Sequence, residues 1–250
     1  MAIDLNAGLG EGGMDDAAIM PFITSANIAC AMHAGDPETM DKTVALALSH
    51  GIQIGAHPGY ADRHNFGRIP VSMSLAGVED LVLYQIAALD GFVQSHGGVL
   101  SHVKPHGALY NQAAEEEPLA RAVARGVARA GRDLALIGLA TTDVMRRTAE
   151  AEGLRFAAEA FADRRYERDG TLQSRRVAGS VITDPAAAAD QAVRIARDGV
   201  VVAVDGTEVR LRADTLCLHG DNPEAVANAR AVRQALERAG VEVCSFARAE

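Results

Sequence analysis

Tryptophan is absent from this chain of 250 residues, and Phe, Trp and Tyr together make up only 4% of it. Surfaces that stack bases or sugars rely on aromatic rings, so this scarcity argues against such a platform. The net charge is −9, and no basic patch stands out. An acidic chain repels phosphate backbones and anionic lipids, so neither nucleic acid nor a membrane is an expected partner.

Long apolar runs are absent as well. No stretch approaches the roughly 20 apolar residues that a membrane-spanning helix needs, and the start at Met1 lacks the features of a signal peptide. The three cysteines, Cys30, Cys217 and Cys244, form no CxxC pair. An odd number of unclustered thiols favours buried, reduced cysteines, and we expect a cytoplasmic protein. Cys30 lies near His33, but a small buried residue is a better interpretation than a thiol nucleophile.

Expected strands and helices alternate along the chain. Asp36-Pro37, Asp184-Pro185 and Asn222-Pro223 each place an N-cap residue before a proline, which is typical of helix starts. The alternation predicts an α/β fold with parallel strands and crossover helices, in one domain over residues 1–250. The expected strands are Ile3–Ala7, Ser25–Cys30, Ile52–Ala56, one running into Lys104, Leu134–Ile137, Arg155–Glu159, Thr215–Leu218 and Val241–Cys244. Helices are expected near 37–50, 75–96, 115–130 and 142–151, and after 184 and 222.

The stretch Val103–Asn111 brings a lysine, a histidine, a tyrosine and an asparagine together after an apolar run. Pro105 cannot donate to a sheet ladder, so a strand should end there. Burying an unpaired polar group is costly, so Lys104 and His106 need a reason to lie at the end of a buried strand. The pattern predicts a strand whose carboxyl end opens onto a polar pocket.

Polar side chains recur at the other predicted strand ends. They are Asp4 and Asn6, His33, His57, Asp163 and Arg164, and His219 and Asp221. In a parallel barrel the carboxyl ends of all strands meet on one face, whereas an open sheet gathers only those near its switch point. So many polar strand ends predict a closed or nearly closed barrel. We expect one pocket to be lined by Asp4, His57, Lys104, His106 and His219.

Other histidines have structural interpretations. His50 and His96 each precede a glycine at a predicted helix end, where a cation interacts favourably with the helix dipole. His64 falls in a polar loop over 61–72, where exposure is expected. For His102, a satisfied buried histidine and a functional one both stay open.

One glycine-rich run, Gly8–Gly13, fits the dinucleotide pattern G-x-G-x-x-G. Asp4 and Asn6 interrupt the smoothly apolar strand that this pattern needs, so the nucleotide interpretation is set aside. The run carries no lysine, and the chain has no G-x-x-x-x-G-K-[ST] loop to hold a triphosphate.

Eight motifs carry a family resemblance: Ile3–Ala7, Ser25–Cys30, His33–Pro37, Gly55–Pro58, Phe66–Arg68, Val103–Asn111, Phe161–Arg164 and His219–Asp221. They resemble those of the LamB/YcsF family, also called the 5-oxoprolinase A subunits. The string Lys-Pro-His-Gly-Ala-Leu-Tyr is highly specific. The chain departs from the family pattern at Ala31-Met32, Ala61 and Ile69, which affects the expected shape of the pocket.

The resemblance implies a distorted seven-stranded (β/α) barrel of the glycoside hydrolase/deacetylase type. It also implies ATP-dependent opening of 5-oxoproline (pyroglutamate) to L-glutamate, in a complex with two other subunits and with ATP as co-substrate. His57, His106 or His219 would act as general base or acid, because imidazole titrates near neutral pH. Lys104 and Arg164 would hold the substrate carboxylate or a phosphorylated intermediate.

Several roles stay open at this level. Asp4 and Asp221 would orient a histidine or bind a metal. The other expected substrate contacts are Asn6, His33, Tyr110, Asn111 and Asp163. A divalent metal, if present, has Asp4, His57 and His106 as candidate ligands, which would suit a metal-dependent, deacetylase-like hydrolase. A third possibility is a non-catalytic subunit that only presents substrate to its partners. For a catalytic subunit, we expect the partner surface near the pocket rim, at the charged loops Tyr60–Arg68 and Arg164–Arg176.

Overall fold

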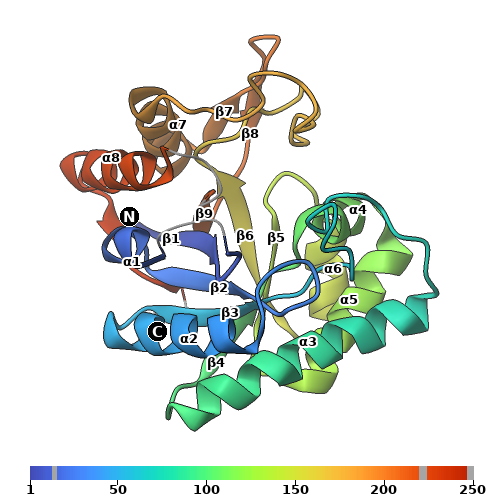
Figure 1. Cartoon of the computed structure of the whole chain (residues 1–250). Helices are drawn as coiled ribbons and strands as arrows, with labels where there is room; N and C mark the ends of the chain where they lie inside the picture. Colours follow the sequence, from blue (N-terminus) through green and yellow to red (C-terminus); the bar gives the residue numbers. More distant parts are fainter. Residues whose placement is uncertain (13–15, 220–223, 247–250) are drawn as a thin grey trace.

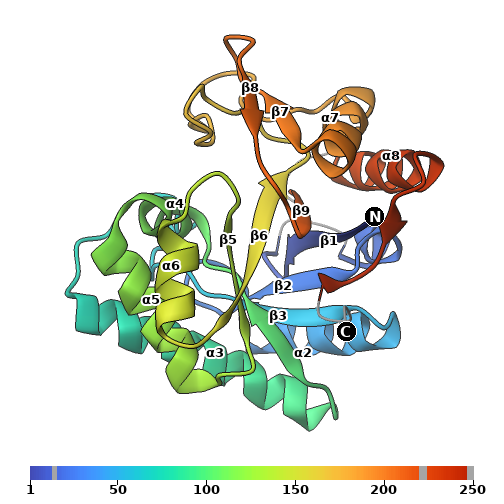
Figure 2. The same cartoon turned by 180° about the vertical axis from the view of Figure 1, so that it is seen from behind.

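The structure is a computed structural model that describes residues 1–12, 16–219 and 224–246. Seven parallel strands form a closed barrel (Figures 1 and 2). In order around the barrel they are β1 (Ala2–Leu9), β2 (Ser25–Ala29), β3 (Gln53–His57), β4 (Leu100–Val103), β5 (Ala135–Leu139), β6 (Arg155–Phe161) and β9 (Thr215–Leu218). The pairing of β1 with β9 closes the barrel, which confirms the predicted fold class.

The strands are short and buried on both faces, as parallel strands covered by helices are. All five residues of β2 and of β5 are buried. The outward faces are mostly small or branched apolar residues, whereas several inward positions are polar. Only two residue pairs join β4 to β5, and the register shifts between β3 and β4. These irregularities distort the barrel, as the family resemblance implied.

Helices cover the outside of the barrel (Figure 1). They are α1 (Asp16–Ile19), the 3-10 helix η1 (Met20–Phe22), α2 (Pro37–Ser49), α3 (Leu75–Ser95), α4 (Gly107–Glu115), α5 (Glu117–Ala130), α6 (Val144–Ala151), α7 (Pro185–Asp198) and α8 (Ala225–Arg238). None of the helices in the described part of the chain is long and apolar enough to cross a bilayer.

The predicted helix caps are present where the structure describes them. Asp36 Oδ1 accepts from the Thr39 amide at 2.8 Å, and Asp184 Oδ1 accepts from the Ala186 amide at 3.1 Å. Asn222-Pro223 lies outside the described residues. His50 ends α2 and His96 ends α3, as expected.

Several elements differ from the prediction. The last strand, β10 (Glu242–Val243), pairs only with Ala2 and Ile3, next to the barrel. An unpredicted hairpin, β7 (Val200–Val202) with β8 (Glu208–Arg210), extends from the barrel beside α7 (Figure 2). Its strands have three residues each, too few to show a period. The helix expected over 115–130 begins at Glu117, and α4 precedes it directly.

Candidate active site

A cleft of about 550 Å³ opens at the carboxyl ends of the strands, a size suited to a small molecule. Seven of the predicted site residues line it: His57, Lys104, His106, Tyr110, Asn111, Arg164 and His219. They come from segments far apart in the sequence, and parallel barrel strands bring them to one face.

Asp4 does not line this cleft, contrary to our expectation. β1 continues to Leu9, so Asp4 lies deep in the barrel, far before the end of its strand. Its Oδ1 accepts from the hydroxyls of Thr24 and Ser25, both at 2.6 Å, and its Oδ2 accepts from the Thr215 hydroxyl. Burial raises the pKa of Asp4 to about 6, although these hydroxyls oppose the shift. The contacts make Asp4 a structural residue and exclude it from the ligand set proposed with His57 and His106.

A buried ion pair forms the floor of the cleft. Lys104 Nζ lies 2.6 Å from Glu159 Oε1, and it also donates to Asn6 Oδ1 at 3.2 Å and Cys217 Sγ at 3.0 Å. Burial alone would lower the pKa of Lys104, but Cys217 and the Glu159 carboxylate more than offset this and raise it. Lys104 is therefore an ammonium ion, and its pairing with Glu159 explains how a lysine can lie at the end of a buried strand.

Asn6 connects this pair to the rest of the barrel interior. Its Nδ2 donates to Glu159 Oε1 at 2.9 Å and to Thr215 Oγ1 at 2.7 Å, while its Oδ1 accepts from Asn27 Nδ2 at 2.7 Å. Asn6 is fully buried and does not line the cleft. Asn6 therefore positions Lys104 and Glu159 from below the cleft surface, whereas the sequence predicted that it would contact the substrate directly.

Two buried polar atoms, the Tyr110 hydroxyl and Glu159 Oε2, make no hydrogen bond of ordinary geometry to a described residue, although the Tyr110 side chain interacts with the Glu159 carboxylate. Burial, followed by the charge of Glu159, raises the pKa of Tyr110 well above its ordinary value. Tyr110 lines the cleft, so its neutral hydroxyl is placed to contact a bound molecule. An unsatisfied buried polar group is costly, and a ligand would relieve that cost.

Asp163 and His219 form a hydrogen-bonded dyad beside the cleft. His219 Nδ1 donates to Asp163 Oδ1 at 2.8 Å, and the His219 backbone N–H donates to Oδ2 at 2.8 Å. Burial lowers the pKa of His219 despite the opposing effect of Asp163, and Arg175 lowers it further. With Nδ1 holding the proton, Nε2 of the neutral ring can accept one. The ring stacks on Phe161 with centroids 5.6 Å apart.

Arginines surround the mouth of the cleft. Arg68, Arg164, Arg175 and Arg176 all line it, although the whole chain is acidic. Arg164 is buried, and its guanidinium donates to the carbonyls of Ser180 and Gln173. Burial and Arg175 lower the pKa of Arg164 to about 10, which leaves it charged at neutral pH. A cationic mouth of this kind attracts and holds an anionic ligand.

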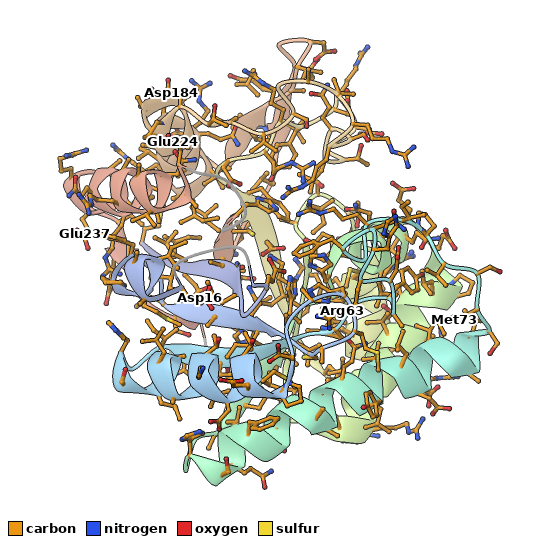
Figure 3. All side chains as sticks on the ribbon, in the orientation of Figure 1. Asp16, Arg63, Met73, Asp184, Glu224 and Glu237 are labelled. Carbon is orange, nitrogen blue, oxygen red and sulfur yellow. The ribbon has the colours of Figure 1, made fainter. Side chains whose placement is uncertain are left out.

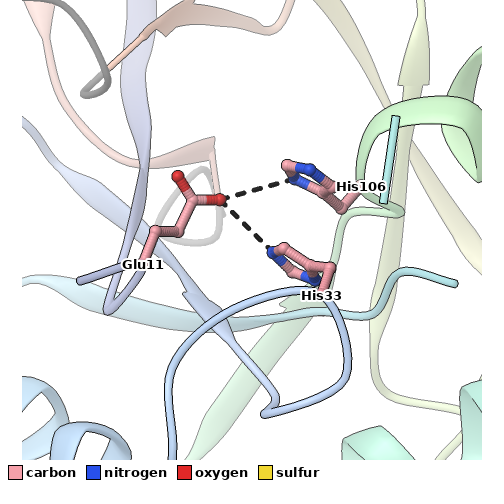
Figure 4. Close-up of side chains that lie close together, drawn as sticks. All are labelled: Glu11, His33 and His106. Carbon is pink, nitrogen blue, oxygen red and sulfur yellow. Dashed lines mark hydrogen bonds and ion pairs between the residues drawn. The ribbon is translucent and has the colours of Figure 1, made fainter. Parts of the chain in front are cut away.

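Glu11, His33 and His106 form a cluster that could hold a metal ion (Figure 4). Glu11 Oε1 lies 3.4 Å from His33 Nε2 and 3.4 Å from His106 Nδ1. His57 adjoins the cluster, with Nε2 at 3.1 Å from His106 Nδ1. His33 is therefore placed with the site residues, but it faces Glu11 and does not line the cleft.

The loop Tyr60–Arg68 fixes these histidines. Arg63, labelled in Figure 3, donates to the carbonyls of Ala31 at 2.9 Å and Gly35 at 2.7 Å, on either side of His33. The Phe66 carbonyl lies 2.9 Å from His106 Nε2. The loop expected to dock partners thus also forms one wall of the site.

The remaining predicted residues have plain placements. Asn111 is exposed at the cleft rim, and Asp221 lies outside the described residues. His102 is fully buried and satisfied, with ring nitrogens 2.7 Å from Ser101 Oγ and 3.0 Å from Asn27 Oδ1. Its two interpretations are resolved in favour of the structural one. Cys30 is a buried free thiol whose pKa burial raises to about 12, so it is no nucleophile.

Sequence reasoning missed Glu11 and Glu159. Glu11 follows the end of β1, the same signal that identified the histidines, whereas Glu159 lies inside β6, two residues before its end. Glu11 was overlooked because the run Gly8–Gly13 was considered only as a possible nucleotide-binding loop. Glu159 was taken as the end of an apolar strand, and nothing local indicates that it faces Lys104.

Known proteins resemble this chain along nearly its whole length. It is 51% identical over 248 residues to the 5-oxoprolinase A subunit of Chloroflexus aggregans, covering 97% of this chain and 98% of that one. It is 50% identical to the protein of the same name from Rhodopseudomonas palustris strain BisB5, covering 99% and 100%. The crystal structure of the lactam utilization protein from Thermus thermophilus matches with a TM-score of 0.92 at 47% identity, covering 98% and 100%. The sequence model of the LamB/YcsF family matches residues 3–250, and the chain belongs to that family.

Proposed function

We propose that this chain is the hydrolytic subunit of an ATP-dependent 5-oxoprolinase, which opens 5-oxoproline to L-glutamate. The observation that carries the proposal is a cleft that combines an anion-binding mouth with an oriented proton acceptor, in a chain about half identical to proteins named for this activity. The proposal also places the chain in the cytoplasm with two other subunits.

The substrate has a carboxylate and a lactam ring, and the cleft offers a group for each. Arg164 and the exposed arginines at the mouth suit the carboxylate, because guanidinium binds carboxylate through paired hydrogen bonds. The Tyr110 hydroxyl, which makes no hydrogen bond of ordinary geometry to a described residue, would donate to the lactam carbonyl oxygen or accept from the lactam N–H. The ring itself fits against the apolar wall of Leu139 and Phe161.

Hydrolysis requires a base for water and an acid for the departing amine. His219 Nε2 would take the proton from the attacking water, and Asp163 would stabilise the resulting imidazolium. The same proton would then pass to the ring nitrogen as the C–N bond breaks. Lys104 would place positive charge near the carbonyl oxygen as it becomes an oxyanion.

ATP enters the proposal through the complex. A five-membered lactam is a stable amide, and the chain has no phosphate-binding loop of the lysine-containing type. We infer that partner subunits supply the coupling to ATP hydrolysis. The loops Tyr60–Arg68 and Arg164–Arg176 border the cleft, so a partner docked there would meet the substrate.

The test is glutamate formation from 5-oxoproline and ATP, first by the purified chain and then after addition of the two partner subunits. We expect turnover only in the complete mixture. Substantial glutamate from the chain alone would refute the dependence on partners. No glutamate from the complete mixture would refute the function.

A further inference from the structure

Two backbone carbonyls determine where the protons of His57 and His106 lie. His57 Nδ1 is 2.6 Å from the Lys104 carbonyl oxygen, and His106 Nε2 is 2.9 Å from the Phe66 carbonyl oxygen. A carbonyl oxygen can only accept, so each of these nitrogens carries a hydrogen. In the neutral rings, His57 Nε2 and His106 Nδ1 then carry lone pairs.

These two lone pairs face each other. The nitrogens are 3.1 Å apart. Two neutral acceptor nitrogens cannot hydrogen-bond to one another. Glu11 Oε1 adds a third acceptor, 3.4 Å from His106 Nδ1 and 3.9 Å from His57 Nε2. The three acceptor atoms, His57 Nε2, His106 Nδ1 and Glu11 Oε1, are therefore directed at one common point, and none of them carries a hydrogen to share with the others.

His33 completes the group. Its ring is stacked on that of His106, with centroids 3.8 Å apart and planes 7° from parallel. His33 Nε2 lies 3.4 Å from Glu11 Oε1, while Nδ1 is buried without a hydrogen-bond partner among the described residues. The ring is held by packing, with Nε2 directed at the carboxylate (Figure 4).

We propose that Glu11, His33, His57 and His106 bind one divalent transition-metal ion of the zinc class. Ligands at about 2.0–2.1 Å from a tetrahedral ion lie roughly 3.3–3.4 Å apart. Four of the six separations among these atoms run from 3.1 to 3.9 Å. The ligand atoms of Glu11, His33 and His106 all lie within 4.8 Å of one another, and His57 adjoins them. Imidazole nitrogens with one carboxylate suit zinc and its neighbours, whereas magnesium and calcium prefer sets of oxygen ligands.

Glycines leave the space that this cage needs. A Cβ atom on Gly59 would lie only 2.8 Å from His33 Nδ1, whereas one on Gly8 would be in ordinary contact, 3.4 Å from both Glu11 Oε1 and His57 Nε2. Glu11 is flanked by Gly10 and Gly12, whose φ angles are 69° and 78°. These left-handed residues turn the chain after β1 so that the carboxylate faces the histidines. The glycine run thus acts in positioning Glu11.

The site adjoins the cleft, which Glu11, His57 and His106 help to line, so a bound ion would lie within reach of a ligand there. The inference goes beyond the proposed function and does not depend on it. Its experiment needs neither substrate nor partner subunits, so the two can fail separately.

The test uses the full chain, freed of any affinity tag and stripped with a chelator. Zinc binding is measured by calorimetry and by elemental analysis after dialysis, and cobalt binding by its visible absorption. We expect one ion per chain, a tetrahedral cobalt spectrum, and a rise in the unfolding temperature with zinc concentration. A wild-type chain that binds neither ion stoichiometrically would overturn the proposal and leave a shared proton between His57 and His106 as the explanation.

Variants assign the ligands. Glu11→Gln and His33→Gln should each weaken zinc binding by about 100-fold or more, since loss of an outer-shell partner alone costs about 10–100-fold. His64→Ala, which removes an exposed imidazole, is the matched control and should bind as wild type does. Circular dichroism without metal verifies the fold. Wild-type affinity in both ligand variants would overturn the assignment, and the wild-type cobalt spectrum decides the case if either variant does not fold.

Discussion

Lys104 Nζ and Glu159 Oε1 lie 2.6 Å apart inside the barrel, and their side chains are only 6% and 0% exposed. Bulk water therefore cannot solvate either charge when its partner is removed. Removing one member of a buried pair typically costs about 3–5 kcal/mol, because the other charge stays buried and uncompensated.

Lys104→Met should therefore lower the free energy of unfolding by about 3–5 kcal/mol as well as abolish activity. The double variant Lys104→Met/Glu159→Gln removes both charges and should recover most of the stability but none of the activity. Urea unfolding and glutamate formation in the reconstituted complex measure the two effects. Activity in the double variant would show that the ammonium has no role in the reaction.

Asp163→Asn tests the dyad. An amide cannot accept from both the His219 backbone N–H and Nδ1–H, so the ring should lose its fixed tautomer. We expect kcat/KM to fall by about 100-fold or more, as in other histidine–aspartate pairs, with the fold retained. Asp143→Asn, at a carboxylate that is 80% exposed, is the control and should leave kcat/KM unchanged. Equal activity of the two variants would count against His219 as the base.

Asp4 makes stability depend on pH. Its folded-state pKa is raised to about 6 from 3.8, so between these values the folded state keeps a proton that the unfolded state loses. Ionisation of Asp4 lowers the free energy of unfolding. This destabilisation is absent below about pH 4, grows as the pH rises, and reaches roughly 3 kcal/mol above about pH 6. Relative to Asp4→Asn, wild-type stability should increase by that amount from pH 7 to pH 4. Urea unfolding at several pH values checks this, and parallel pH profiles would contradict it.

Gly55→Ala tests the packing of His102. A Cβ atom on Gly55 would lie 2.1 Å from the His102 ring, and strand and ring cannot both keep their places. We expect a loss of about 3 kcal/mol or more. Gly91→Ala is the matched control, because Gly91 lies in α3 with nothing within 4 Å of an added Cβ. That change should stabilise the helix by about 0.5–1 kcal/mol. Similar melting temperatures for the two variants would contradict the crowding at Gly55.

The barrel could be predicted from the sequence because a closed ring of parallel strands gathers many polar strand ends in one place, which an open sheet does not. The Val103–Asn111 stretch behaves as expected, with a strand ending at Val103 and Lys104 and His106 at the cleft. Asp4 was expected among the polar strand ends that line the pocket, and its carboxylate instead bonds to hydroxyls of Ser25 and Thr215 from neighbouring strands. The sequence alone does not show how far along the barrel axis Asp4 lies, because that position depends on the register between neighbouring strands.

The rest of the site depends on contacts between distant segments. The partner of Lys104 comes from β6, and the carbonyl that orients His106 comes from Phe66 in a loop. The sequence names these residues but not their pairings. The hairpin of β7 and β8 had one local sign, Asp205-Gly206, a common turn pair.

The closure of β1 against β9 has a consequence for synthesis. During translation, β1 to β6 emerge long before Thr215–Leu218, and β1 keeps an unpaired edge until that last barrel strand arrives. Unpaired strand edges invite association between chains. We expect a nascent chain halted before Thr215 to require chaperone protection and to aggregate on release, as ribosome-release and solubility assays would show. A soluble, folded fragment ending there would contradict this. The pocket would then exist only once the polypeptide is almost finished, so no half-made chain could act on substrate.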